Sequence, residues 1–208
     1  YARKIACMMN DFLRFDDEAA EYRLILLHGW GADLEDLVPL GRELIKAVNH
    51  KFELVALQAP QAHPDNLGRQ WYPLFPADWE SVPSAINDLQ NRIRTLETNQ
   101  ISLSQTILLG FSQGGAMALG AGCNMPLFGI ITCSAYPHPG WKVPSERPKV
   151  LMTHGTNDEI VPFQASNSLL NSLSKQEQSV ELFEFEGGHE ISPQAINRIK
   201  LTLNNWLI

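Results

Sequence analysis

Cysteine is scarce in this sequence of 208 residues, which contains only Cys7, Cys123 and Cys133. An odd number of cysteines cannot pair completely, and their spacing matches no metal-binding motif. Neither a disulfide framework nor a metal site is therefore expected. We interpret the three cysteines as buried thiols in a reducing compartment, and we predict a cytoplasmic location.

Long apolar runs and an excess of positive charge are also missing. No stretch approaches the roughly eighteen apolar residues that indicate a membrane-spanning helix, and the apolar part of residues 1–9 is too short for a signal peptide. The formal net charge is −7, from 16 Lys and Arg against 23 Asp and Glu. An acidic chain of this kind is not expected to bind nucleic acid or an acidic membrane surface. We also predict no integral membrane association.

Apolar runs of strand length alternate with helical patterns over most of the chain. The runs lie at residues 23–27, 52–57, 106–109, 128–133, 150–153 and 180–185. Such alternation predicts an α/β protein with an open, mainly parallel twisted sheet and helices on both faces. We predict a single domain over residues 1–208, with a short hairpin within residues 1–20. Ligands of such sheets bind at the C-terminal ends of the strands.

The most informative stretch is Gly110-Phe111-Ser112-Gln113-Gly114, which stands between a buried strand and a helical pattern. A serine flanked by glycines at this junction is the pattern of a nucleophile elbow. The glycines allow the strand and the helix to meet closely, and the hydroxyl then points out of the sheet edge. The N–H of Gln113 lies at the start of the helix, where it can donate to an oxyanion.

A serine nucleophile needs a base, and the base needs an acid that orients it. On a turn of this kind the chain order is Ser, then Asp or Glu, then His. Of the six histidines, only His189 follows the last predicted strand and precedes the last helix. Asp158 follows the strand that ends near residue 153 and is the preferred acid, with Glu159 and Glu186 as alternatives.

Two further segments are predicted to shape the site. The segment His28-Gly29-Trp30-Gly31 follows the first core strand, so the backbone N–H of Trp30 is expected to be the second oxyanion donor. The loop at 61–79 is rich in aromatic residues, and Trp71, Tyr72 and Phe75 are predicted to form an apolar wall for the substrate. The connection at 134–148 is too short for a large cap domain.

At these residues the chain resembles the phospholipase/carboxylesterase and acyl-protein thioesterase family of α/β-hydrolases. The resemblance runs from about residue 23 to the end and rests on motifs at 27–33, 58–60, 69–72, 110–115, 154–162 and 188–189. It implies the α/β-hydrolase fold, with Ser112, Asp158 and His189 as a catalytic triad and Trp30 and Gln113 as backbone donors. It also implies cofactor-free hydrolysis of esters or thioesters with medium to long acyl chains. Residues 1–20 lie outside the resemblance.

The sequence therefore predicts a serine hydrolase that cleaves carboxylic esters or thioesters of neutral acyl chains through an acyl-enzyme on Ser112. Few charges other than Arg69 lie near the motifs, which favours a neutral acyl group. The expected partners are small-molecule or acylated-protein substrates, and a weak homodimer is left open. The alternatives are a non-catalytic ligand-binding protein on this fold and an acyltransferase to an acceptor other than water.

Overall fold

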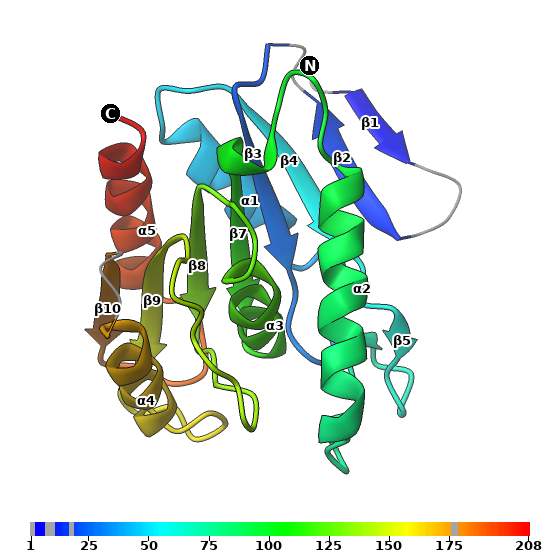
Figure 1. Cartoon of the computed structure of the whole chain (residues 1–208), viewed down its shortest axis with the longest axis vertical. Helices are drawn as coiled ribbons and strands as arrows, with labels where there is room; N and C mark the ends of the chain where they lie inside the picture. The colour runs from blue at the N-terminus through cyan, green and yellow to red at the C-terminus, as the bar shows by residue number, and fades with distance from the viewer. Residues whose placement is uncertain (1–2, 7–10, 17–18, 176–178) are drawn as a thin grey trace.

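The computed structural model describes residues 3–6, 11–16, 19–175 and 179–208, and an eight-stranded sheet forms its centre (Figure 1). The strands lie in the order β1-β2-β4-β3-β7-β8-β9-β10. Strand β2 runs antiparallel to both of its neighbours, and every pair from β4 to β10 is parallel. The strands are β1 (Arg3–Ala6), β2 (Phe12–Asp16), β3 (Tyr22–Leu27), β4 (Phe52–Leu57), β7 (Thr106–Phe111), β8 (Gly129–Cys133), β9 (Lys149–Gly155) and β10 (Val180–Phe185).

Helices cover both faces of the sheet, and each face has its own core. Leu89 of α2, Met117 of α3 and Leu169 of α4 belong to one cluster of buried residues, in front of the sheet in Figure 1. Leu44 of α1 and Leu203 of α5 belong to the cluster on the opposite face. The strands between the two clusters are mostly apolar because a parallel sheet is covered on both sides. The helices are α1 (Val38–Lys46), α2 (Val82–Thr95), α3 (Gln113–Gly122), α4 (Gln164–Leu173) and α5 (Pro193–Trp206).

The α/β fold class predicted from the sequence is confirmed, and the sheet is open and mainly parallel. Helix α5 begins as its sequence indicates, because Ser192 accepts a hydrogen bond from the N–H of Ala195 at 3.2 Å and Pro193 follows directly. At the N-terminus, β1 pairs with β2 in an antiparallel hairpin. Residues 7–10, which include Cys7, lie outside the described residues.

Two long connections leave the sheet near the C-terminal ends of its strands. The connection at 134–148 contains no helix or strand and builds no cap domain. The other connection, at 58–78, contains a small two-stranded sheet of β5 (Gln61–Ala62) and β6 (Arg69–Gln70), and it leads through the short helix η1 (Trp79–Ser81) into α2. A second 3-10 helix, η2 (Leu103–Gln105), precedes β7. Within the described ranges, no helix has both the length and the apolar character needed to cross a bilayer.

Candidate active site

Ser112 lies at a sharp turn between β7 and α3, in a backbone conformation that L-residues rarely adopt. Its φ is 53° and its ψ is −117°, and such strain is typical of functional sites. The neighbouring glycines make the turn sterically feasible. A Cβ added to Gly110 would collide with the backbone of Gly114, and one added to Gly114 would collide with the carbonyls of Leu27 and His28 at the end of β3. The turn is therefore pressed against both α3 and the neighbouring strand.

The structure brings together the three side chains that the sequence singled out. His189 Nε2 lies 2.9 Å from Ser112 Oγ, and His189 Nδ1 lies 2.7 Å from Asp158 Oδ2. A carboxylate oxygen only accepts, so Nδ1 carries the proton and donates to Asp158, while Nε2 accepts from the serine hydroxyl. The three residues come from the loops after β7, β9 and β10, which end at the same edge of the sheet. The alternative acids, Glu159 and Glu186, do not take part in this hydrogen-bonded path.

Asp158 is held on both of its oxygens. Oδ1 accepts hydrogen bonds from the backbone N–H groups of Ile160 at 2.9 Å and Val161 at 2.8 Å, while Oδ2 faces His189. Burial acts to raise the pKa of Asp158, but the hydrogen bonds from His189 and from Val161 N–H outweigh it and hold the pKa below its ordinary value. Asp158 is therefore ionised at neutral pH and can stabilise a positive charge on His189.

The segment at 28–32, which we call the strap, passes directly beside the serine. A Cβ added to Gly29 would lie 3.6 Å from Ser112 Cβ. The strap carries the N–H of Trp30, and the N–H of Gln113 belongs to the first turn of α3, where backbone donors have no intrahelical partner. The two N–H groups predicted as oxyanion donors thus come from two segments that adjoin Ser112, the strap and the first turn of α3.

The long connection at 58–78 fixes the strap. The N–H of Gly31 donates to the carbonyl of Arg69 at 2.9 Å, and the N–H of Arg69 donates to the carbonyl of Ala32 at 2.8 Å. The indole N–H of Trp30 donates to Gln70 Oε1 at 3.0 Å. Strand β6 therefore serves as a backbone template for the strap.

The side chain of Gln113 binds the same connection to the serine turn. Its Oε1 accepts from the N–H of Trp71 at 3.0 Å, and its Nε2 donates to the carbonyl of Tyr72 at 2.8 Å. The indole N–H of Trp71 donates in turn to the carbonyl of His28 at 2.9 Å. Gln113 is fully buried, so these contacts form a dry link between the serine turn, the connection and the strap. The sequence prediction used only the backbone of Gln113 and missed this role of its side chain.

The prediction that three aromatic side chains line the substrate site is wrong for Trp71 and Tyr72. Trp71 is 1% exposed and Tyr72 is 0% exposed. The indole of Trp71 binds the strap, and the hydroxyl of Tyr72 binds Tyr136 and His138. Phe75 is 68% exposed, and its ring lies 5.2 Å from the ring of Trp30. Trp30 also packs edge-on against His63 at 4.0 Å. Of the aromatic residues predicted to face the substrate, Phe75 is thus free to do so, and it lies beside the strap.

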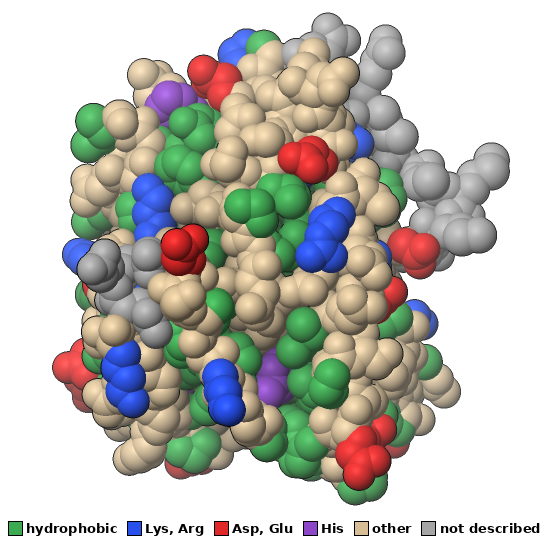
Figure 2. All heavy atoms as spheres, in the orientation of Figure 1, with side chains coloured by type: hydrophobic (Ala, Val, Ile, Leu, Met, Phe, Trp, Pro, Cys, Tyr) green, Lys and Arg blue, Asp and Glu red, His purple; other side chains and the backbone are tan. Residues whose placement is uncertain are grey.

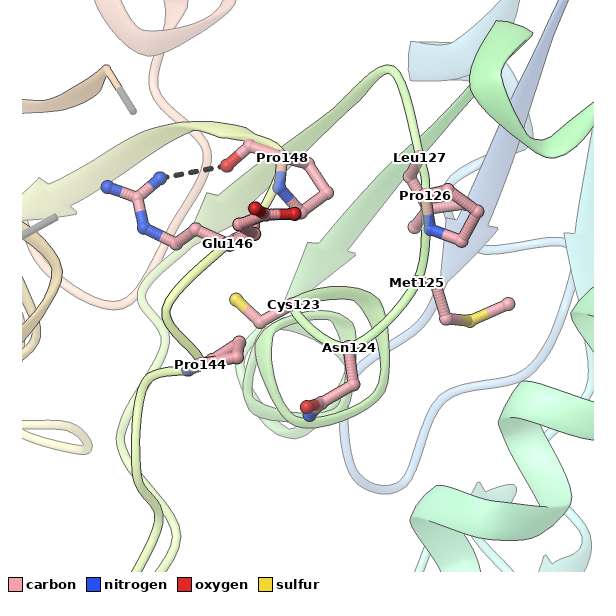
Figure 3. Close-up of a pocket in the computed structure, with 9 residues that line it drawn as sticks. Cys123, Asn124, Met125, Pro126, Leu127, Pro144, Glu146 and Pro148 are labelled. Atoms are coloured by element: carbon pink, nitrogen blue, oxygen red, sulfur yellow. Dashed lines mark hydrogen bonds between the residues drawn. The ribbon is translucent and has the colours of Figure 1, made fainter. Parts of the chain in front are cut away.

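Cavities in the described part of the molecule also lie away from the serine, and two of them border α3. Cys123 lines one of about 410 Å³ at the C-terminal end of α3, where it faces the 144–148 segment across the hollow (Figure 3). Ser112 begins α3, so this cavity lies about one helix length from it, roughly 15 Å. A second cavity of about 450 Å³ is lined by α2, the end of α3 and His138. Figure 2 looks onto this face, where hydrophobic side chains gather around a histidine.

No cluster of three or more His, Cys, Asp or Glu side chains in the described ranges is placed to hold a metal ion. The two cysteines within these ranges, Cys123 and Cys133, are buried free thiols. Burial raises the pKa of each thiol to about 12, so neither is a thiolate at neutral pH.

The fold and the serine turn define the class of protein. A mainly parallel sheet, a serine in a strained strand-to-helix turn and a histidine after the last strand are features of α/β-hydrolases. The chain belongs to the family described as Phospholipase/Carboxylesterase, which it matches over residues 12–207. The resemblance inferred from the sequence motifs is therefore confirmed, and the protein is a hydrolase.

Individual relatives agree with this assignment. The chain is 25% identical over 210 residues to acyl-protein thioesterase 1 homolog 1 of Dictyostelium discoideum. This alignment covers 91% of this chain and 92% of the relative. The crystal structure of esterase PE8 matches with a TM-score of 0.80 and 29% identity over 90% of this chain and 93% of its own. A carboxylesterase of Bacillus cereus has a TM-score of 0.79 at 17% identity, over 96% of this chain and 95% of its own. This last similarity is evidence for the fold alone.

Proposed function

We propose that this hydrolase cleaves carboxylic esters or thioesters of neutral acyl chains through an acyl-enzyme on Ser112. The observation that carries the proposal is the continuous hydrogen-bonded path from Asp158 Oδ2 through His189 to Ser112 Oγ, with distances of 2.7 and 2.9 Å. Each side chain in the path has the chemistry its position requires, since a carboxylate orients the imidazole and the imidazole accepts the serine proton.

In the first step, His189 Nε2 takes the proton of Ser112 as Oγ attacks the carbonyl carbon of the substrate. The carbonyl oxygen becomes negative, and the N–H groups of Trp30 and Gln113 stabilise it. The bond to the leaving alcohol or thiol then breaks, and the leaving group receives the proton from His189. Asp158 stabilises the imidazolium that exists between these proton transfers.

In the second step, a water molecule replaces the leaving group. His189 takes one proton from this water as its oxygen attacks the acyl-enzyme carbonyl. The bond from Ser112 Oγ to the acyl carbon breaks, and the serine regains its proton from His189. The second step releases a carboxylic acid and regenerates the enzyme, so each cycle consumes one substrate molecule and one water and needs no cofactor.

Two features support a neutral acyl chain. The ring of Phe75 is exposed beside the strap, where it offers apolar surface to a substrate. The guanidinium of Arg69 is engaged by the carbonyls of Ala59 at 2.9 Å and Pro60 at 2.5 Å, so it is not directed to a charged acyl group. The thioesterase and esterase names of the relatives agree with this substrate class. We keep small-molecule and acylated-protein substrates, a weak homodimer and the cytoplasmic location as predictions.

Labelling with a fluorophosphonate probe tests the nucleophile. We expect the wild-type protein to gain one adduct on Ser112, and we expect Ser112→Ala to lose both the adduct and roughly 10⁴- to 10⁶-fold in turnover of a p-nitrophenyl ester. Ser168→Ala, at an exposed serine of α4, is the matched control and should label normally. A wild-type protein that is not labelled, or an S112A variant that keeps half its activity, would refute the proposal.

A series of esters and thioesters with increasing acyl length then defines the substrate. We expect kcat/KM to rise with chain length for neutral acyl groups and to fall when a carboxylate is placed on the acyl end. Adding a competing alcohol tests the acceptor, because release of the free acid identifies water as the dominant nucleophile. Preferential formation of a new ester would instead identify an acyltransferase.

A further inference from the structure

A second histidine lies behind the carboxylate of Asp158. His154 is near the end of β9, four residues before Asp158, and it is completely buried. Its Nε2 lies 2.8 Å from the carbonyl oxygen of Val161 and 3.2 Å from Asp158 Oδ2. Its Nδ1 lies 2.6 Å from the hydroxyl of Ser166 on α4. Chain order excluded His154 as the base, and the mechanism above does not use it.

The partners of His154 determine where its proton lies. The carbonyl of Val161 can only accept, so Nε2 carries a hydrogen and donates it to Val161 O at 2.8 Å, while Asp158 Oδ2 lies 3.2 Å from the same nitrogen. In the neutral ring Nδ1 is then an acceptor, and the hydroxyl of Ser166 donates to it. Ser166 is itself 1% exposed, so this arrangement is shielded from water.

His154 remains uncharged in this environment. Burial lowers its pKa, and the opposing effects of the Val161 carbonyl and of Asp158 do not cancel that shift. The other residue that faces it is Phe163, whose ring lies edge-on at 5.7 Å. A neutral donor behind Asp158 holds the carboxylate without neutralising it, so the negative charge remains available to His189.

We propose that His154 is a positioning residue for the hydrolytic site, whose Nε2 side supports Asp158 Oδ2 while the carbonyl of Val161 fixes the tautomer of His154 and Ser166 anchors its Nδ1. Asp158 then accepts from Ile160 and Val161 on one oxygen, while the other oxygen accepts from His189 and has His154 Nε2 at 3.2 Å. With two neighbouring groups at each oxygen, the carboxylate is held against rotation away from His189. The proposal rests on the proposed function, because it concerns the orientation of the same acid.

A matched pair of variants separates positioning from simple packing. The side-chain nitrogen of His154→Gln can reach the position of Nε2, whereas the shorter His154→Asn places its amide near Nδ1. We expect H154N to lower kcat by roughly 10- to 100-fold with little change in KM, since small displacements of a catalytic group have effects of that size. We expect H154Q to stay within roughly fivefold of wild type, because it restores the donor to Asp158. Denaturant unfolding of both variants shows whether they lose stability equally.

Ser166→Ala provides a second route if H154N does not fold. This variant keeps the ring and the donor but removes the hydrogen bond that anchors Nδ1, and we expect kcat to fall by about threefold to tenfold. Fluorophosphonate labelling counts the competent sites, so kcat is expressed per site. Equal losses in H154N and H154Q, or full activity in both H154N and S166A, would overturn the proposal for His154. Failure of the wild type to label at Ser112 would instead refute the proposed function.

Discussion

The functional groups proposed around Ser112 fall into two halves. The side-chain half consists of the side chains of His189 and Asp158, and the backbone half consists of the backbone N–H groups of Trp30 and Gln113. The side-chain half is joined by direct hydrogen bonds between the groups themselves. The backbone half has no such direct link. The connection at 58–78 holds it, through β6 and through the side chain of Gln113.

The two halves should therefore be sensitive to different kinds of mutation. In the side-chain half, a change of residue type removes the chemistry itself. In the backbone half, the N–H groups survive any substitution except proline, so only their position can be lost. Mutations of the first kind should therefore abolish turnover at unchanged stability, while mutations of the second kind should change stability and turnover together.

The largest effect is expected for Asp158→Asn in the side-chain half. An amide would present a donor to His189 Nδ1 and would favour the wrong tautomer, so kcat should fall by about 10⁴-fold with the fold intact. Steady-state kinetics and denaturant unfolding measure the two quantities. Asp88→Asn on the exposed face of α2 is the control. A D158N enzyme that loses less than roughly tenfold would place the acid elsewhere.

Gly114→Ala should have the next largest effect, because Gly114 lies where the serine turn meets the end of β3 and the strap. The added methyl group would collide with the carbonyls of Leu27 and His28. We expect the free energy of unfolding to fall by about 4 kcal/mol or more, or the protein not to fold. At Gly188 an added Cβ meets no atom within 4 Å, so the unfolding curve of Gly188→Ala should stay close to that of wild type. Comparable losses in both variants would contradict this account.

Gln113→Leu tests the link within the backbone half. It leaves the buried N–H of Trp71 and the carbonyl of Tyr72 without partners, at a cost of about 1–3 kcal/mol each. Turnover should fall by roughly 10- to 100-fold as the strap loses its position. Urea unfolding and kcat are the measurements. A loss of stability at full kcat would show that the strap is held without this side chain.

Trp71 and Phe75 should respond differently to the length of the acyl chain. Trp71→Phe removes the indole donor to His28, so kcat/KM should fall by about tenfold for acetyl and long-chain esters alike. Phe75→Ala removes exposed apolar surface and should lower kcat/KM by roughly tenfold for long chains only. A chain-length dependence in W71F, or none in F75A, would reverse these roles.

The smallest effect concerns His138, which lies 3.0 Å from the hydroxyl of Tyr72 at the edge of the backbone half. Burial lowers the pKa of His138 to about 4 from an ordinary value of 6.5. As the pH falls from 6.5 toward 4, the unfolded chain takes up this proton first. This group should therefore contribute a loss of stability of at most about 1.4 kcal/mol per pH unit. His138→Gln should reduce the slope of unfolding free energy against pH, and an unchanged slope would disprove the assignment.

The side-chain half could be predicted from the sequence, while much of the backbone half could not. Ser112, Asp158 and His189 follow strands in a fixed order, and parallel strands end at one edge. The sequence predicted that Trp71 faces the substrate. That prediction was wrong because an aromatic residue in a loop can equally line a pocket or pack in a core. Its burial follows from hydrogen bonds to His28 and Gln113, which are 43 and 42 residues away in sequence. The same limit applies to His154, whose partner Ser166 comes from α4.

Three features could be read from the sequence without a structure: the alternation of strands and helices, the glycine-flanked serine, and the chain order of the acid and the base. These features are local, because hydrophobic periodicity and the steric freedom of glycine act over a few residues. Tertiary structure alone decided which segment holds the strap, which aromatic residues are buried and which histidine stands behind Asp158. These outcomes depend on contacts between distant segments, and burial sets both their strength and the pKa of the groups involved.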